Sequence, residues 1–451
     1  MASEVNSNKL QKDKAHREEV DETKYSMDTH LIYGKNITTK WDYSHHVVSP
    51  ISSSTTFRLD SVERGAQGFI SFANTPSMRE DESPIYIYDR LGEPNKDILE
   101  ENLAYIEKGE MAVTFATGMG AISGALGVLT KSGDEIIAHS TLYGCTISLL
   151  NNWYPRYNIQ VTYTDLTNAE NLCGLIKKNT KVIYFETPAN PNLELIDIQK
   201  ISEILREVNR SRDENNQVRM VVDNTFSTPF CQRPLEFGAD IVLHSLTKGI
   251  GGFGTDMGGV VIGRKEFRDL LLLYRKDFGG VLNTKSAWAI LTYGLPSLAV
   301  RQRQQIRSAQ RIAEYLSHHP KVEFVNYPGL PDFKHYDLAI KQMKDFNGNF
   351  APGSLIYFVL KGNSVDETRE RGRKFMNYVA DNAYTMTLAV SLGHTRTLIE
   401  HPASMTHSVV PSEKLKEKRI DPGGIRLAIG LENPDDLLFD LDECLKSFEK
   451  E

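Results

Sequence analysis

Residues 239–259, ADIVLHSLTKGIGGFGTDMGG, decide how the fold of this chain is interpreted. The stretch begins with a short apolar run, residues 241–243, which predicts a buried strand. The run leads into His-Ser-Leu-Thr-Lys, and the glycines after Lys248 are incompatible with an ordinary helix or strand. We therefore expect Lys248 to lie in a tight loop at the end of a strand, partly out of bulk water.

The residue types around Lys248 suggest a chemical role. Ser245 and Thr247 can donate hydrogen bonds to a phosphate while the lysine amine reaches a carbonyl carbon, as a pyridoxal-phosphate Schiff base requires. A surface lysine beside a glycine-rich turn is the alternative, because the motif is short. Residues 249–254 also spell G-x-G-x-x-G, but residues 258–262 predict a strand where a dinucleotide site needs a helix.

Composition bounds the class of protein. The chain has 451 residues, of which 40% are hydrophobic and 25% charged, so we expect two or three structural units with a large core. The net charge of -7 gives no indication of nucleic-acid or membrane binding. The four cysteines are widely spaced, which fits reduced thiols and a cytoplasmic protein.

The N-terminal part shows little regular periodicity. Residues 1–25 mix many charges of both signs with few apolar residues, which predicts a disordered tail and not a signal sequence. Residues 25–92 indicate an extended arm, so we take 1–92 as the first part of the chain. Tyr88 and Arg90 close this arm and point the same way in an extended backbone, where they could hold a phosphate or simply face solvent.

Residues 93–298 alternate between strand and helix patterns. This alternation predicts an α/β domain with a mainly parallel sheet. One unit runs from a strand at 111–116 through Gly118 and Met119 into a small-residue helix at 121–129. Such a turn can bind phosphate at the helix N-terminus, although a purely structural turn is the alternative.

Several polar residues follow the predicted strands. Ligands bind beyond the carboxyl ends of parallel strands, where these side chains would meet. They are Tyr143, Glu186, Asn190, Asp223, Ser245, Thr247 and Lys248. Asp223 ends an apolar run and would pair with a protonated pyridine nitrogen, or would form an Asx-turn with the residues after it.

Residues 299–451 have fewer strands, which look antiparallel, and predict a smaller C-terminal α+β domain. Arg426 lies in an apolar strand pattern, where it would need a bound carboxylate or an internal acid as its partner. A loop at 393–407 carries several histidines. Their spacing matches no standard metal cluster, so we expect no metal site, and loop packing is the interpretation we favour. These residues are His394, His401 and His407.

Eight motifs occur in one order along the chain, and in that order they resemble the Cys/Met-metabolism family of pyridoxal-phosphate enzymes. They are Tyr88-Asp89-Arg90, Ala116-Thr117-Gly118-Met119, Leu142-Tyr143-Gly144-Cys145-Thr146, Tyr184-Phe185-Glu186-Thr187-Pro188-Ala189-Asn190-Pro191, Val222-Asp223-Asn224-Thr225-Phe226, Gly238-Ala239-Asp240, His244-Ser245-Leu246-Thr247-Lys248 and His401-Pro402-Ala403-Ser404-Met405-Thr406-His407. The resemblance implies the transferase fold of type I, a tetramer built from dimers, and an arm that contacts the neighbouring subunit.

The resemblance also implies a role for individual residues. Lys248 would carry pyridoxal 5'-phosphate and move protons, Asp223 would pair with the ring nitrogen, and Tyr143 would stack on the ring and act at the leaving group. The remaining implied roles are Asn190 for the ring hydroxyl; Gly118, Met119, Ser245 and Thr247 for the phosphate, with Tyr88 and Arg90 from the neighbouring subunit; and Ser391, Arg426 and Cys145 for the substrate.

The resemblance further implies cleavage or replacement at the γ-carbon of a sulfur amino acid or an activated homoserine. The residue types at Cys145 and Val390 resemble those of methionine gamma-lyases at the matching positions, so α,γ-elimination is the first hypothesis. γ-Replacement, as in cystathionine gamma-synthases and sulfhydrylases, and a non-catalytic scaffold are the alternatives. Three places depart from the family pattern and would border the pocket entrance, namely Gly249, residues 253–256 and Glu93-Pro94-Asn95.

Overall fold

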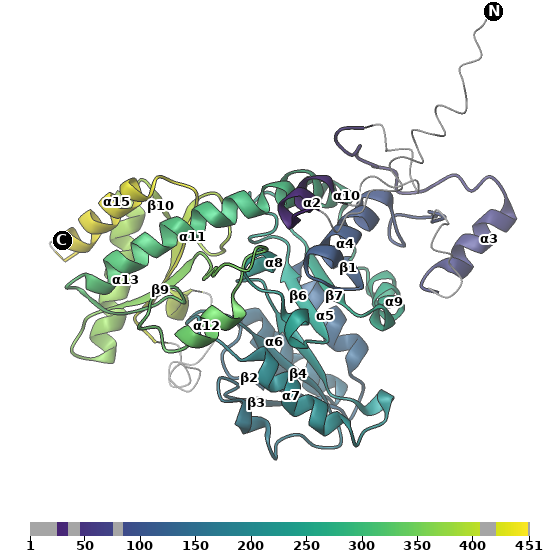
Figure 1. Ribbon diagram of the computed structural model, residues 1–451, viewed down its shortest axis with the longest axis horizontal. Helices are drawn as coiled ribbons and strands as arrows, with labels where there is room; N and C mark the ends of the chain where they lie inside the picture. The colour runs from purple at the N-terminus through teal and green to yellow at the C-terminus, as the bar shows by residue number, and fades with distance from the viewer. Residues whose placement is uncertain (1–24, 35–45, 75–83, 406–420, 450–451) are drawn as a thin grey trace, which may run out of the picture.

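The computed structural model describes residues 25–34, 46–74, 84–405 and 421–449. Two sheets with their covering helices form the body of the molecule, and residues 46–74 extend away from it (Figure 1). The expectations for the tail at 1–24 and for His407 lie outside the described residues.

The larger sheet has seven strands in the order β1-β7-β6-β5-β4-β2-β3. Only β7 runs antiparallel to its neighbours, which confirms the predicted mainly parallel α/β sheet. The strands are β1 (Met111–Phe115), β2 (Glu135–His139), β3 (Gln160–Thr164), β4 (Thr180–Glu186), β5 (Arg219–Asp223), β6 (Ile241–Ser245) and β7 (Gly259–Gly263). The strand that follows the glycine loop is thus β7, as the sequence predicts.

Helices cover both faces of this sheet because its strands are apolar on both sides. One face packs against α5 (Gly118–Leu129), α6 (Gly144–Asn152) and α9 (Arg268–Phe278). The other face packs against α7 (Ile198–Asn209) and α4 (Pro94–Ile106). The short helices α8 (Thr228–Cys231) and α10 (Thr284–Ala289) complete this part of the chain. The carboxyl ends of β4, β5 and β6 remain at one edge, where the loops of the candidate site begin.

The smaller sheet has five strands in the order β10-β11-β12-β9-β8. They are β8 (Val322–Asn326), β9 (Leu355–Leu360), β10 (Met386–Leu388), β11 (Thr397–Glu400) and β12 (Gly424–Ala428). The sheet is mixed and not wholly antiparallel, since β10 pairs with β11 in parallel. Sequence reasoning missed β11, because its four residues lie among loop-like polar residues.

Three helices cover one face of the smaller sheet: α11 (Leu295–His318), α13 (Val365–Asn382) and α15 (Pro434–Ser447). The short α12 (Tyr336–Gln342) lies between β8 and β9 in the chain. The opposite face packs against Leu193 and Phe226, which lie on loops of the larger sheet. The two sheets therefore share an apolar interface, and the long α11 runs from one unit to the other (Figure 1).

The arm is less extended than the sequence predicts. It contains α2 (Met27–Tyr33) and α3 (Val62–Ser71), and α3 begins where Ser61 accepts the N–H of Arg64. Sequence reasoning missed both because they are short, and α2 is stabilised by packing against α11.

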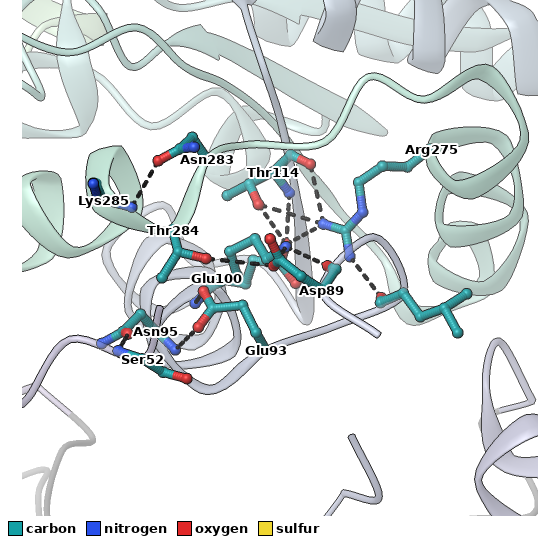
Figure 2. Close-up of polar contacts among 12 residues, drawn as sticks. Ser52, Asp89, Glu93, Asn95, Glu100, Thr114, Arg275, Asn283, Thr284 and Lys285 are labelled. Carbon is teal, nitrogen blue, oxygen red and sulfur yellow. Dashed lines mark hydrogen bonds and ion pairs between the residues drawn. The ribbon is translucent and has the colours of Figure 1, made fainter. Parts of the chain in front are cut away.

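The arm is fixed to the larger unit at the start of α4. Glu93 and Asn95 are fully buried there, and Glu93 caps the helix by accepting the N–H groups of Asn95 and Lys96 (Figure 2). Asn95 accepts the N–H of Ser52 at 2.8 Å. Asn95 therefore fixes the arm to α4, whereas Glu93 caps that helix.

A buried ion pair lies beside the base of the arm. Arg275 on α9 donates from Nη1 to Glu100 Oε1 at 2.6 Å, and the same oxygen accepts the N–H and hydroxyl of Thr114 on β1 (Figure 2). Arg275 is 1% exposed. If Arg275 were removed, Glu100 would remain buried without its cation, which is strongly destabilising. The ion pair therefore holds α4, β1 and α9 together.

We expect Arg275→Met to lower the free energy of unfolding by about 3–5 kcal/mol, because it leaves Glu100 buried and unpaired. Urea unfolding of the cofactor-loaded protein measures the change. Lys276→Met, which breaks the surface pair with Asp277, is the matched control and should cost about 1 kcal/mol or less. Equal losses in the two variants would contradict this account.

Candidate active site

Lys248 lies in the turn that follows β6. Its N–H donates to the carbonyl of Ser245 at 3.2 Å, and its carbonyl accepts the N–H of Gly252 at 2.8 Å. Its Nζ donates to Ser391 Oγ at 2.6 Å. Burial, and then the charge of Arg426, lowers the pKa of the amine to about 8. About a tenth of the amine is therefore neutral, and so nucleophilic, at pH 7, against less than about one part in a thousand for an ordinary lysine.

An anion-binding corner lies next to this turn. The helix α5 begins at Gly118, and its cap residue Thr117 accepts the N–H of Gly120 at 2.9 Å. A Cβ on Gly118 would lie 2.8 Å from the Cβ of Ser245, so only glycine allows this close approach. The first-turn N–H groups of Gly118 and Met119 and the Ser245 hydroxyl can therefore converge on a phosphate.

Thr247 is also held at this corner. Its Oγ1 accepts the N–H of Gly258 at 3.1 Å, which ties the two ends of the glycine loop together. Thr225, after β5, uses its hydroxyl to accept the N–H of Ser245 at 2.8 Å. The motifs around 118, 225 and 245–247 are thus adjacent in space although they are far apart in the sequence.

Two acids lie side by side at the ends of β4 and β5. Glu186 and Asp223 are cross-strand partners, and burial raises the pKa of each carboxyl, with the Asp223 charge as a further cause for Glu186. Asp223 accepts the N–H of Thr225 at 3.0 Å through Oδ1. The side chain of Thr225 also bonds to this carboxylate, and a cationic N–H beside it would favour its charged form.

Tyr143 begins α6 above this acid pair. Its N–H donates to Glu186 Oε1 at 2.8 Å. Burial raises the pKa of its phenol, with Cys145 and the carboxylates of Glu186 and Glu400 as further causes. The phenol is therefore protonated at neutral pH and can serve as a donor. Cys145 lies two residues further on, in the first turn of α6, and is exposed.

Arg426 connects the smaller sheet to the site. Its Nη1 donates to Asn190 Oδ1 at 2.9 Å, and its Nη2 donates to the carbonyl of Ser391 at 3.0 Å. Nη2 also lies 3.0 Å from Glu400 Oε1, its neighbour across β11 and β12. Arg426 is 3% exposed, and its Nε has no hydrogen-bond partner among the described residues. This donor is open to a carboxylate.

Tyr88 and Arg90 are not part of this cluster within one subunit. Tyr88 is 41% exposed, and Arg90 donates to the carbonyl of Lys276 at 2.8 Å. No contact within the described residues joins either side chain to Lys248, Ser245 or Gly118. The arm instead presents both side chains on an outer surface of the subunit.

The arrangement fits pyridoxal 5'-phosphate on each of its functional groups. The α5 corner could hold the phosphate, the Asp223 carboxylate could pair with a protonated ring nitrogen, and the Lys248 amine could meet the aldehyde. The fold and the half-buried Lys248 thus fit an enzyme that uses pyridoxal phosphate.

Comparison with known proteins places this enzyme in a family. A model of the Cys/Met metabolism PLP-dependent enzymes matches residues 28–446. The chain belongs to this family, and its cofactor is pyridoxal phosphate.

Relatives and solved structures agree with this assignment. An L-methionine gamma-lyase of Porphyromonas gingivalis is 41% identical over 402 residues, which cover 89% of this chain and 93% of the relative. An O-acetyl-L-homoserine sulfhydrylase of Leptospira meyeri is 34% identical over 80% of this chain and 86% of the relative. The crystal structure of a cystathionine gamma synthase from Xanthomonas oryzae, in complex with aminoacrylate and cysteine, has a TM-score of 0.80 at 33% identity, covering 94% of this chain and 99% of that chain.

Sequence reasoning missed three residues of the cluster. Glu400 ends a strand that the sequence did not predict. It lies opposite Arg426 and is the internal acid partner predicted as one alternative for this arginine. Thr225 was noted only within a motif, and its hydroxyl binds the Ser245 backbone. His394 was considered as a loop or metal residue, and it lies 3.4 Å from Ser391 Oγ. Within the described ranges, no three His, Cys, Asp or Glu side chains group as metal ligands.

We expect the Lys248 amine of the cofactor-free, full-length protein to react with acetic anhydride as a group of pKa about 8. Its reactivity should rise through pH 8, because the neutral amine is the nucleophile. Mass spectrometry of the Lys248 peptide across pH measures this, with exposed lysines such as Lys178 as the internal reference. A midpoint near the ordinary lysine value of about 10.4 would refute the desolvated amine.

Proposed function

We propose that the protein catalyses α,γ-elimination of L-methionine, with a sulfur leaving group at the γ-carbon. The carrying observation is the 39–41% identity to L-methionine gamma-lyases over about nine-tenths of the chain. The geometry supports it, since the Lys248 amine lies against Ser391, the Arg426 guanidinium binds the Ser391 carbonyl, and the Tyr143 phenol interacts with Arg426.

The substrate carboxylate binds Arg426 in this proposal. The Nε of Arg426 has no hydrogen-bond partner among the described residues and can donate one hydrogen bond to a carboxylate. Asn190 holds the guanidinium at Nη1, and Glu400 and the carbonyl of Ser391 hold it at Nη2. The hydroxyl of Ser391 adds a further donor beside the Lys248 amine.

Proton transfers at the substrate are assigned to two side chains. When bound, pyridoxal phosphate supplies a protonated ring that accepts the electron pair left on a substrate carbon. Lys248 removes the proton from Cα and then the proton from Cβ, and its lowered pKa suits both directions of transfer. Tyr143, whose phenol keeps its proton, donates toward the departing sulfur at Cγ.

We further propose that a second subunit completes the phosphate site. Tyr88 and Arg90 lie on the arm, away from their own Lys248, where they could reach the corner of a neighbouring chain. The assembly would be a tetramer of two such dimers. A cytoplasmic location is part of this proposal, since all four cysteines are free. In the described part of the chain, no helix is both long and apolar enough to cross a bilayer.

γ-Replacement is the second candidate, and the 34% identity to a sulfhydrylase favours keeping it. The side chains that remove the protons and expel the leaving group would be the same. The difference is whether water or a thiol reacts after the γ-substituent leaves. In this proposal the glycine-rich loop at 249–254 lies where the second reactant would enter the site.

Product analysis separates the two. The purified, cofactor-loaded protein is incubated with L-methionine and with O-acetyl-, O-succinyl- and O-phosphohomoserine, with and without a thiol. We expect methionine to give 2-oxobutanoate, ammonia and methanethiol in equal amounts. A new thioether as the main product would establish replacement, and no turnover of any substrate would contradict both.

We expect Arg426→Lys to raise KM for methionine about 30-fold, because lysine cannot bind the carboxylate and Asn190 together. kcat should fall less, because the Lys248 amine remains. Steady-state kinetics measure the split. Arg311→Lys, at a surface pair with Asp435, is the matched control and should leave KM unchanged. An unchanged KM in Arg426→Lys would remove this residue from the substrate site.

A further inference from the structure

The segment that carries Ser391 also places a histidine against the loop that follows Lys248. Gly393 has φ +75°, and a Cβ there would lie 2.3 Å from the backbone nitrogen of Gly249. A Cβ on Gly254 would lie 2.5 Å from the ring of His394. Glycines therefore allow the His394 ring to pack directly on the lysine loop.

A chain of polar contacts runs from the lysine to this ring. Lys248 Nζ lies 2.6 Å from Ser391 Oγ, and Ser391 Oγ lies 3.4 Å from His394 Nε2. The carbonyl of His394 accepts the Nε2 group of Gln305 on α11 at 2.8 Å, which fixes the backbone. Ser391 has φ +105°, a strained value that this packing maintains.

Ser391 has one hydroxyl hydrogen, so the hydrogen bonds from Lys248 through Ser391 to His394 can run in either of two directions. When Lys248 is an ammonium, it donates to Ser391 Oγ, and the hydroxyl hydrogen can point to a neutral His394 Nε2. When His394 is protonated, its Nε2–H donates to the serine, whose hydrogen then points to a neutral amine. The two arrangements link the charge of His394 to that of Lys248.

We propose that His394 is a positioning residue that sets the orientation and proton occupancy of the Lys248 amine through Ser391. It lies at the outer end of the path Lys248–Ser391–His394, and its ring is partly exposed, so it can exchange a proton with water. The inference rests on the proposed function for its catalytic consequence, whereas the link between the two charges does not depend on it.

Electrostatics agree with the geometry. Burial, and then the charge of Lys248, lowers the pKa of His394. The charges must therefore disfavour one another, so protonation of His394 lowers the pKa of Lys248 in return. The other titratable or charged groups on the elements packed around the pair are Tyr143, Arg301, Arg396, Glu400, Arg426 and Glu432.

Labelling of Lys248 in the cofactor-free, full-length protein tests the link without any turnover. Below pH 6.5 the wild-type reactivity should lie above the straight line extrapolated from higher pH, because a charged His394 favours the neutral amine. His394→Asn cannot gain this charge and should follow the straight line. His318→Asn, an exposed histidine in the last turn of α11, is the matched control and should match the wild type.

Kinetics of the loaded enzyme test the consequence. His394→Asn should lower kcat about tenfold, leave KM within about twofold, and remove the acidic limb of the kcat profile that His394 contributes. His394→Gln should recover part of the loss, because its amide can contact Ser391. Equal urea midpoints would show that the variants are folded.

A labelling profile in His394→Asn identical to that of His318→Asn would overturn the proposal. If the loaded wild-type protein turns over none of the substrates, the proposed function fails, and the labelling comparison still decides whether His394 controls Lys248. A changed labelling profile with unchanged kcat and pH profile would overturn the catalytic part of the proposal.

Discussion

The Arg426 guanidinium is the contact on which the rest of the site depends. It is buried on a strand of the smaller sheet, and it reaches Asn190 of the larger unit and the carbonyl of Ser391. The hydroxyl of Ser391 in turn accepts a hydrogen bond from the Lys248 amine. Because the buried Arg426 guanidinium can satisfy its hydrogen bonds in few arrangements, it fixes the loops of the larger sheet relative to the smaller sheet. Glu400 offsets the cost of burying that charge.

Burial at the carboxyl edge of the large sheet shifts the pKa of the amine and the pKa values of the acids in opposite directions. It lowers the pKa of the Lys248 amine, and it raises the pKa of the Asp223 and Glu186 carboxyls and of the Tyr143 phenol. Each shift favours a neutral side chain in this subunit. A cationic ring nitrogen and an anionic phosphate would restore the balance, which explains why so many polar groups share one edge.

The sequence predicted the larger unit well because its strands are apolar and its turns carry glycine. Lys248 and Asp223 could be placed at one edge by the rule for parallel sheets, and the structure describes them there. The helices of the arm were not predictable, since α2 depends on packing against α11. Glu400 was not predicted as a site residue, because its partner Arg426 lies in another segment and a four-residue strand gives little periodicity. His394 was not predicted either, because its contact with Ser391, three residues away, depends on the local backbone conformation.

Borohydride reduction of the cofactor-loaded protein, followed by mass spectrometry of its peptides, tests the central claim most directly. Reduction fixes the cofactor covalently to the lysine that bears it. The account predicts one modified residue, Lys248, and no modification in Lys248→Ala. A cofactor fixed on any other lysine of the wild-type protein, or an unmodified Lys248 in a fully loaded sample, would contradict it.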